Sequence, residues 1–334
     1  MKLVLIGLGY WGPNLLRTFN NLGVLYAAVD FDETKLVKFK SDPVYRDVIF
    51  STTWTQYLDI GDIDGFIIAT PPHTHYDIAI EALRCGKHVF IEKPMTLNEN
   101  HAEELKSFAE KNNLVISVGH IFLYSPEIVK LKEIISSEEF GSVRYIYTQR
   151  LNLGKIQRPA NVVDDLAPHD ISILDFLLNR SCTAVQVVAK SHVIDTEDVA
   201  FVNLKYNNVL CHLHLSWLDP LKVRNTVVVG TKQMAVCDSM SKTVTIYNTG
   251  VDVEKTEAAM SESYSNYLMT YRYGDTLIPQ IDNYEPMKAE CQDFIKAIKE
   301  KIVPKASAYI GVSVVRTLAA MKRSLEGEGR WENI

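Results

Sequence analysis

The chain opens on a short apolar run followed by a cluster of glycines: residues 2–16 read KLVLIGLGYWGPNLL. The cluster has the spacing G-x-G-x-x-G and lies between an expected strand and an expected helix over residues 12–21. The first glycine of such a motif permits a tight turn, the second lets the backbone approach a pyrophosphate, and the third allows close helix–strand packing. The helix N-terminus also favours phosphate charge. We assign the loop to dinucleotide binding through Gly7, Gly9, Tyr10, Trp11 and Gly12.

An acidic residue stands where this motif needs one, about 20 residues after the last glycine. Asp30 ends the second expected strand, and its carboxylate would accept bonds from both ribose hydroxyls and repel a 2′-phosphate. Phe31 follows, and no arginine or serine is placed to hold that phosphate. We therefore expect NAD rather than NADP. The alternative is that Asp30 is the N-cap of the next helix or a turn residue, because Asp32 and Thr34 follow it.

The patterning along the chain predicts two domains. Fully apolar strands alternate with helices in the first third, which is typical of a parallel sheet covered on both faces. We predict an α/β protein, with an NAD-binding Rossmann domain of doubly wound parallel sheet over residues 1–122. Longer strands of alternating polarity then predict a C-terminal α+β domain over 123–334, with a large, mostly antiparallel open sheet that has one polar face. We expect this domain to bind substrate, and a long alternating sheet needs one face covered, so we also expect it to form oligomers.

Three local features refine that second domain. A helix is expected from about Pro168 to Leu178, with the proline in its first turn. Asn207-Asn208 separates two expected strands and reads as a hairpin turn. His212 and His214 alternate along a strand, so they share a face, but no third ligand for a metal is suggested.

Composition excludes several classes. The 334 residues are 47% hydrophobic and 23% charged, with a net charge of −6, which argues against a nucleic-acid partner. Five scattered cysteines without C-x-x-C spacing predict free thiols in a reducing cytosol and no metal site. The sequence shows no signal peptide and no apolar run of membrane-spanning length. We expect a cytoplasmic protein that does not bind membranes.

Two further motifs follow apolar strands at their carboxyl ends, where ligands of open α/β sheets bind. The first is the segment Thr70–His75, TPPHTH, in which prolines fix a rigid loop. From it we assign Thr70, Pro71 and His75 to the cofactor site, where His75 shapes the pocket or caps its helix. The second is Glu92-Lys93-Pro94, where the lysine would point at the nicotinamide and the proline is a candidate for a cis peptide bond. Glu92 and Lys93 therefore complete the predicted cofactor site.

These motifs, in their order and spacing, resemble the family of glucose–fructose oxidoreductase, inositol dehydrogenase and rhizopine-catabolism proteins. The resemblance covers essentially the whole chain. It implies hydride transfer between nicotinamide and a sugar or polyol carbon, a catalytic role for Lys93, and a C-terminal sheet used for oligomerisation. We expect a homodimer or homotetramer.

The family's second catalytic segment, D-x-x-x-H, is matched by Asp165-Leu166-Ala167-Pro168-His169. A helical path places Asp165 and His169 on one side. Oxidation of a secondary alcohol also removes the hydroxyl proton, and a neutral imidazole suits that task. We predict His169 as general base, oriented by Asp165 or relaying the proton to it. Lys93 would polarise the reacting oxygen or share the role of base, and the sequence leaves open which of the two accepts the proton.

The substrate class follows from looser similarity. The stretches GHIFLY at 119–124 and QRLNLG at 149–154 look like family members that oxidise the 3-hydroxyl of a UDP-linked amino sugar or uronic acid in surface-polysaccharide pathways. A basic loop between the sheet and the Asp–His segment could pair with a diphosphate or carboxylate, or could be a solvated loop. The candidate substrate contacts are Tyr124, Arg150, Asn152 and Arg158, with Lys155 and Trp217 as further candidates.

Three other functions stay open at this stage. One is an NADP-dependent keto-sugar reductase, against which Asp30 speaks. Another is a polyol dehydrogenase of the inositol type. The last is a nicotinamide-binding regulator without catalysis, which would have no evident use for Lys93 and His169 as proton acceptors.

Overall fold

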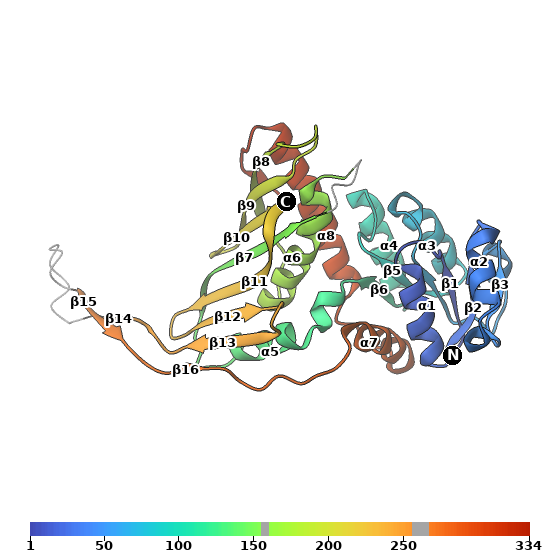
Figure 1. Cartoon of the computed structure of the whole chain (residues 1–334), viewed down its shortest axis with the longest axis horizontal. Helices are drawn as coiled ribbons and strands as arrows, with labels where there is room; N and C mark the ends of the chain where they lie inside the picture. Colours follow the sequence, from blue (N-terminus) through green and yellow to red (C-terminus); the bar gives the residue numbers. More distant parts are fainter. Residues whose placement is uncertain (155–159, 256–266) are drawn as a thin grey trace. The chain divides into compact units, whose positions relative to one another are not determined.

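The computed structural model describes residues 1–154, 160–255 and 267–334, and these form two compact units (Figure 1). The first unit comprises Met1–Tyr124 and Tyr284–Ala319, and the second comprises Ser125–Asn283 and Ala320–Ile334. The predicted boundary between an NAD-binding domain over 1–122 and a C-terminal domain over 123–334 stays a prediction. The compact units differ from it because the chain returns to the first unit near its end.

The first unit is built on a six-stranded parallel sheet with the order β3-β2-β1-β4-β5-β6, which confirms the predicted Rossmann sheet. Apolar runs without polar alternation make these strands, and β1 and β4 are buried at every position. The strands are β1 (Leu3–Ile6), β2 (Leu25–Val29), β3 (Ile49–Ser51), β4 (Gly65–Ile68), β5 (His88–Glu92) and β6 (Ile116–Gly119). The sequence did not predict β3, because it is short and partly exposed.

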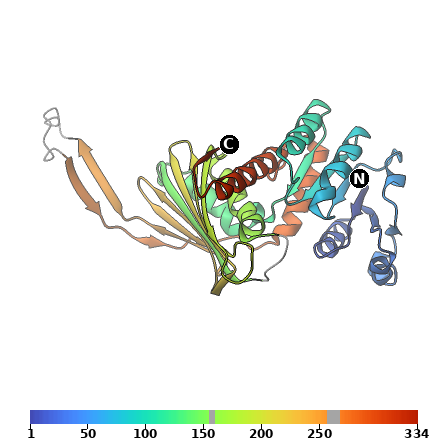
Figure 2. The same cartoon turned by 90° about the horizontal axis from the view of Figure 1, so that it is seen from above.

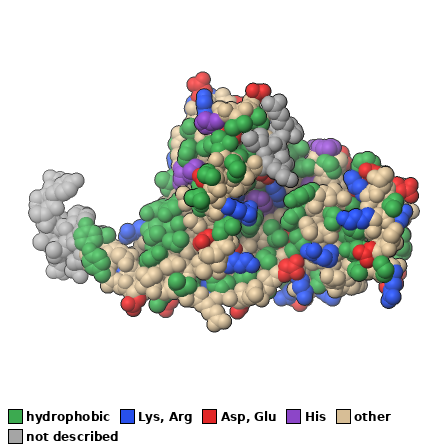
Figure 3. All heavy atoms as spheres, viewed as in Figure 1, with side chains coloured by type: hydrophobic (Ala, Val, Ile, Leu, Met, Phe, Trp, Pro, Cys, Tyr) green, Lys and Arg blue, Asp and Glu red, His purple; other side chains and the backbone are tan. Residues whose placement is uncertain are grey.

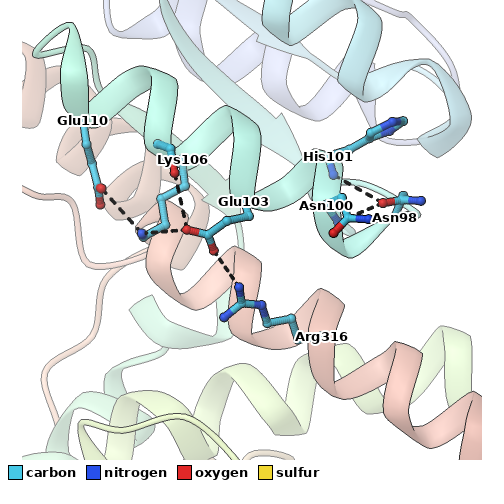
Figure 4. Close-up of polar contacts among 8 residues, drawn as sticks. Asn98, Asn100, His101, Glu103, Lys106, Glu110 and Arg316 are labelled. Atoms are coloured by element: carbon cyan, nitrogen blue, oxygen red, sulfur yellow. Dashed lines mark hydrogen bonds and ion pairs between the residues drawn. The ribbon is translucent and has the colours of Figure 1, made fainter.

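Helices of the first unit connect successive strands of this sheet. Their bounds are α1 (Gly12–Asn21), α2 (Glu33–Lys40), α3 (His75–Arg84) and α4 (Glu99–Lys111). As predicted, Asn98 caps α4, since its side chain accepts the backbone N–H groups of Asn100 and His101 (Figure 4).

The first unit also contains the late helix α7 (Pro286–Glu300) and the part of α8 (Ala308–Glu326) that ends at Ala319. The middle of α8 contacts α4 through Arg316, whose guanidinium lies 3.0 Å from Glu103, and Glu103 also accepts a bond from Lys106 (Figure 4). Gly311 fits beneath Met95, because a Cβ there would lie 2.8 Å from its sulfur. Residues from the end of the chain therefore pack on the nucleotide-binding fold.

The second unit carries a nine-stranded sheet of order β16-β13-β12-β11-β7-β10-β9-β8-β17, which is mixed but mostly antiparallel, as predicted (Figures 1 and 2). The pair β7–β10 is parallel. The predicted hairpin is confirmed, since β9 and β10 are antiparallel and Asn207 has a φ of 55°. The strands are β7 (Val143–Leu153), β8 (Ala184–Lys190), β9 (Val199–Tyr206), β10 (Val209–Ser216), β11 (Leu218–Gly230), β12 (Met234–Asp238), β13 (Thr243–Tyr247), β16 (Thr276–Leu277) and β17 (Glu332–Asn333).

Helices α5 (Pro126–Ile135) and α6 (Val162–Leu178) pack on this sheet, α5 at β12 and β13 and α6 at β9 and β10. The predicted start of α6 at Pro168 is wrong. The helix begins six residues earlier, where the side chain of Asn161 accepts the N–H of Asp164 at 2.9 Å. Pro168 therefore lies in the helix interior, where it removes the bond to the carbonyl of Asp164.

The exposed face of this sheet is less polar than the sequence suggests. Hydrophobic side chains drawn green reach the surface where the strands lie (Figure 3), and the exposed ones include Tyr145, Val188, Phe201 and Leu210. His212 and His214 do share a face, as predicted, and both rings stack near Phe201. A separate two-stranded ribbon is formed by β14 (Gly250–Lys255) and β15 (Tyr267–Arg272).

Candidate active site

The glycine-rich loop between β1 and α1 fits a dinucleotide. Gly7 has a φ of +99°, and a Cβ there would lie 2.5 Å from the carbonyl oxygen of Ala69. A Cβ on Gly12 would lie 2.1 Å from the carbonyl oxygen of Gly7. Gly9 has nothing within 4 Å of the same position, so packing does not explain this glycine. The open space above Gly9 is where a side chain would obstruct a pyrophosphate.

These surroundings predict that one substitution weakens NAD binding and that another lowers stability. Gly9→Val is expected to leave the melting temperature unchanged and to raise the Kd for NAD by tenfold or more, which corresponds to about 1.4 kcal/mol. Gly12→Ala is expected to lower stability by about 1–3 kcal/mol, because the methyl group meets backbone. Calorimetric titration with NAD and thermal unfolding measure the two quantities. Normal NAD affinity in Gly9→Val would contradict the assignment of the loop.

Asp30 is buried beside this loop. Its carboxylate accepts the backbone N–H of Leu8 at 2.8 Å and that of Asp32 at 3.0 Å, and the Lys35 ammonium lies 3.4 Å away. The cap of α2 is Asp32, so Asp30 is not a helix cap, whereas the bond from the Asp32 N–H makes Asp30 the turn residue that the alternative also named. The position of Asp30 at the carboxyl end of β2 suits a ribose contact. Sequence reasoning missed Lys35, whose charge compensates that of Asp30.

A histidine joins the two loops that follow β4 and β5. His75 is fully buried, with Nε2 2.9 Å from the carbonyl oxygen of Thr70 and Nδ1 2.9 Å from that of Pro94. Burial lowers the pKa of His75, and these backbone contacts oppose the shift. The Lys93–Pro94 peptide is cis, as the sequence suggested. His75 thus links the loop after β4, at Thr70, to the Glu-Lys-Pro segment after β5.

Two titratable groups beside Lys93 have shifted pKa values. Burial raises the pKa of Glu92 to about 8, although the Lys93 backbone N–H, the Lys93 charge and a hydrogen bond from Trp11 lower it. Burial and the charge of Lys93 lower the pKa of His120 to about 3. His120 is 1% exposed, and its ring nitrogens have no partner among the described residues. The sequence analysis used His120 only as part of the stretch at 119–124 and predicted no role for it.

The predicted acid–base pair lies in the second unit. Asp165 and His169 both belong to α6, four residues apart, so the helical path expected between them is confirmed. The indole N–H of Trp217 donates to Asp165 at 3.2 Å. Trp217 is 1% exposed, so it holds Asp165 rather than presenting its ring to solvent. The Asn152 amide lies nearby, since a Cβ on Gly154 would meet both Asn152 and Trp217.

Arg150 and Tyr124 are committed to contacts within their own units. The guanidinium of Arg150 forms two bonds to the Asp170 carboxylate, at 2.9 and 3.0 Å, and both residues are buried. The Tyr124 hydroxyl donates to Asp293 at 2.7 Å and accepts the N–H of Ala306 at 3.1 Å. These contacts favour structural roles. Substrate contact stays a prediction for both, and the predicted contacts Arg158 and Lys155 lie outside the described residues.

A Rossmann sheet with a glycine-rich loop, joined to a large mixed sheet, defines a two-part dinucleotide-binding protein. The sequence profile described as "Oxidoreductase family, NAD-binding Rossmann fold" matches residues 1–120, and the profile of the GFO/IDH/MocA C-terminal domain matches residues 128–236. The chain belongs to this oxidoreductase family, and its first unit is the NAD-binding part. The resemblance stated from the motifs is thereby confirmed.

Among curated proteins, the chain is similar to the UDP-N-acetylglucosamine 3-dehydrogenase of Acidithiobacillus ferrooxidans, at 30% identity over 193 residues. That match covers 57% of this chain and 60% of the relative. Inositol 2-dehydrogenase of Salmonella typhimurium is 26% identical over 197 residues, covering 56% of this chain and 57% of the relative. The matched stretches thus span about three fifths of the relatives' length.

The fold has close counterparts among solved structures. UDP-N-acetylglucosamine 3-dehydrogenase GnnA from Acidithiobacillus ferrooxidans superposes with a TM-score of 0.82 at 22% identity, over 98% of both chains. This likeness shows the fold alone. Among the described residues, no helix is long and apolar enough to span a bilayer.

Proposed function

We propose that this protein is an NAD-dependent dehydrogenase that oxidises a secondary hydroxyl of a sugar, the 3-hydroxyl of a UDP-linked amino sugar or uronic acid, for surface-polysaccharide synthesis in the cytoplasm. The observation that carries the proposal is the helical pair Asp165 and His169, held by Trp217, in a chain that also carries Lys93 at the carboxyl edge of a Rossmann sheet. The similarity to a UDP-N-acetylglucosamine 3-dehydrogenase supports the substrate class.

The proposal assigns each residue a task. NAD, when bound, takes up the hydride released from the substrate carbon. Lys93 bonds the reacting oxygen, and His169 takes the hydroxyl proton or shares that role with Lys93. Asp165 orients the His169 ring. A homodimer or homotetramer that covers the exposed sheet face belongs to the same proposal.

Identifying what the purified protein binds and converts tests the proposal. We expect NAD, and a UDP-sugar where one is retained, to be released on denaturation and identified by mass spectrometry. Incubation with NAD and UDP-N-acetylglucosamine, or its uronic acid, should produce NADH and a 3-keto sugar. NADH formation with myo-inositol and none with any UDP-sugar would favour the polyol alternative, which the Salmonella relative supports. Preference for NADPH and a keto-sugar would favour the reductase.

A further inference from the structure

The loop over residues 191–198 joins β8 to β9 in the second unit, and Asp198 closes it. Asp198 is fully buried. Oδ2 of its carboxylate accepts the backbone N–H groups of His192 and Val193, each at 2.8 Å, and Oδ1 lies 2.8 Å from Nδ1 of the His192 ring. The Asp198 N–H donates to the carbonyl oxygen of Lys190 at 3.0 Å. One residue thus ties the end of the loop to its beginning.

Glu197, immediately before Asp198, binds the start of α6. Its backbone carbonyl accepts the N–H of Val162, the first residue of the helix, at 2.9 Å. Its carboxylate accepts a bond from the side-chain amide of Asn161 at 3.1 Å, and Asn161 is the residue that caps α6. The loop therefore supplies an acceptor for one of the N–H groups that a helix leaves without a partner inside its own first turn.

Asp198 itself holds the backbone of Trp217. Its carbonyl accepts the Trp217 N–H at 2.9 Å, and the Trp217 carbonyl accepts the N–H of Gly154, also at 2.9 Å. The indole N–H of the same tryptophan donates to Asp165 on α6 at 3.2 Å. Two adjacent carbonyls, those of Glu197 and Asp198, therefore bind the helix that carries Asp165 and the tryptophan that holds its carboxylate.

We propose that Asp198, with His192 as its partner, is a positioning residue for the acid–base pair on α6. Hydrogen bonds to a carboxylate are short and strong, so three of them fix the backbone at the end of the loop. That backbone fixes the first turn of α6 and the place of Trp217, and together these set the distance between the indole N–H and Asp165. Asp165 orients His169 in the proposed function, and only this last step rests on that function.

Substitutions within the loop separate this role from a general loss of stability. Asp198→Ala removes all three bonds of the carboxylate, and His192→Ala removes one of them. Asp198→Asn keeps them, because its amide oxygen accepts both backbone N–H groups and its NH2 group donates to a neutral imidazole ring. Val193→Ala is the matched control, since that residue is 60% exposed and the variant retains its backbone N–H.

The indole N–H signal of Trp217 in an NMR spectrum reports this geometry without any turnover. The chain has four tryptophans, and Asp165→Asn identifies the Trp217 signal because it alters the acceptor of that N–H. The signal should move in Asp198→Ala, move less in His192→Ala, and keep its wild-type position in Asp198→Asn and Val193→Ala. If Asp198→Ala does not fold, His192→Ala carries the same test. A wild-type position in every folded variant of Asp198 and His192 overturns the proposal.

Kinetics supply the second readout. In Asp198→Ala, kcat should fall about 10–100-fold, the cost of a small misplacement of catalytic groups. The Kd for NAD should stay unchanged, because the glycine loop and Asp30 belong to the first unit. Asp198→Asn should recover most of kcat. A moved indole signal with unchanged kcat overturns the link to catalysis. Absent turnover in the wild type, with the indole signal moved in Asp198→Ala, refutes the proposed function and leaves the positioning of Asp165 established.

Discussion

Replacing Lys93 or His169 by alanine is expected to lower kcat by about 10²–10⁴-fold, the range that positioned acid–base groups contribute. Lys93 is half-buried at the end of β5 and His169 lies in α6, so neither substitution removes a large apolar side chain. NAD affinity should persist, because the glycine loop and Asp30 are untouched. Steady-state NADH formation and calorimetric NAD titration give the two quantities.

An exposed lysine supplies the control for this pair of variants. Lys111 ends α4 on the surface, and Lys111→Ala should keep wild-type turnover and NAD affinity. Full activity in both Lys93→Ala and His169→Ala would contradict the assigned chemistry. Absence of turnover even in the wild type, with tight NAD binding, would instead favour the regulator, which binds a nicotinamide cofactor without using these groups.

The sequence predicts the nucleotide-binding half well because its signals are local. Apolar runs predict β1, β2 and β4, and the spacing of the three glycines is read from one short stretch of chain. The sequence predicts the helix bounds of the second unit less well. The start of α6 was misplaced because proline was assigned its usual place in a first turn, although Asn161 followed by Asp164 is an ordinary capping signal.

The surroundings of Lys93 could not be predicted, because they come from residues that are distant in the chain. Helix α7 reads as ordinary amphipathic sequence, and the contact between Phe90 and Phe294 is what places it beside β5. The ion pair of Arg150 is a similar case. A basic residue near a predicted site suggests an anionic substrate, whereas the fold supplies Asp170 as its partner.

Asp170→Asn is expected to destabilise the protein by about 3–5 kcal/mol, the usual cost of leaving one member of a buried ion pair uncompensated. Arg150 is 4% exposed and Asp170 is 2% exposed, so water cannot replace the lost carboxylate. Arg224 on β11 lies opposite Arg150 on β7 in the antiparallel sheet, and the charge of Asp170 also stabilises the charged form of Arg224. The variant therefore removes a carboxylate that serves two guanidinium groups.

Thermal and urea unfolding measure this loss, which corresponds to a fall in melting temperature of about 10 °C. The double variant Arg150→Met/Asp170→Leu removes the ion pair as a whole and should recover part of the stability, because apolar groups of similar size can replace a buried pair, while Arg224 still loses the Asp170 charge. A substrate role for Arg150 makes a different prediction. If the arginine bound a diphosphate or carboxylate, Asp170→Asn would leave stability nearly unchanged and alter the KM for the sugar. Stability loss without that KM change would assign Arg150 to holding α6 on the sheet, and so to the placement of His169 one residue before Asp170.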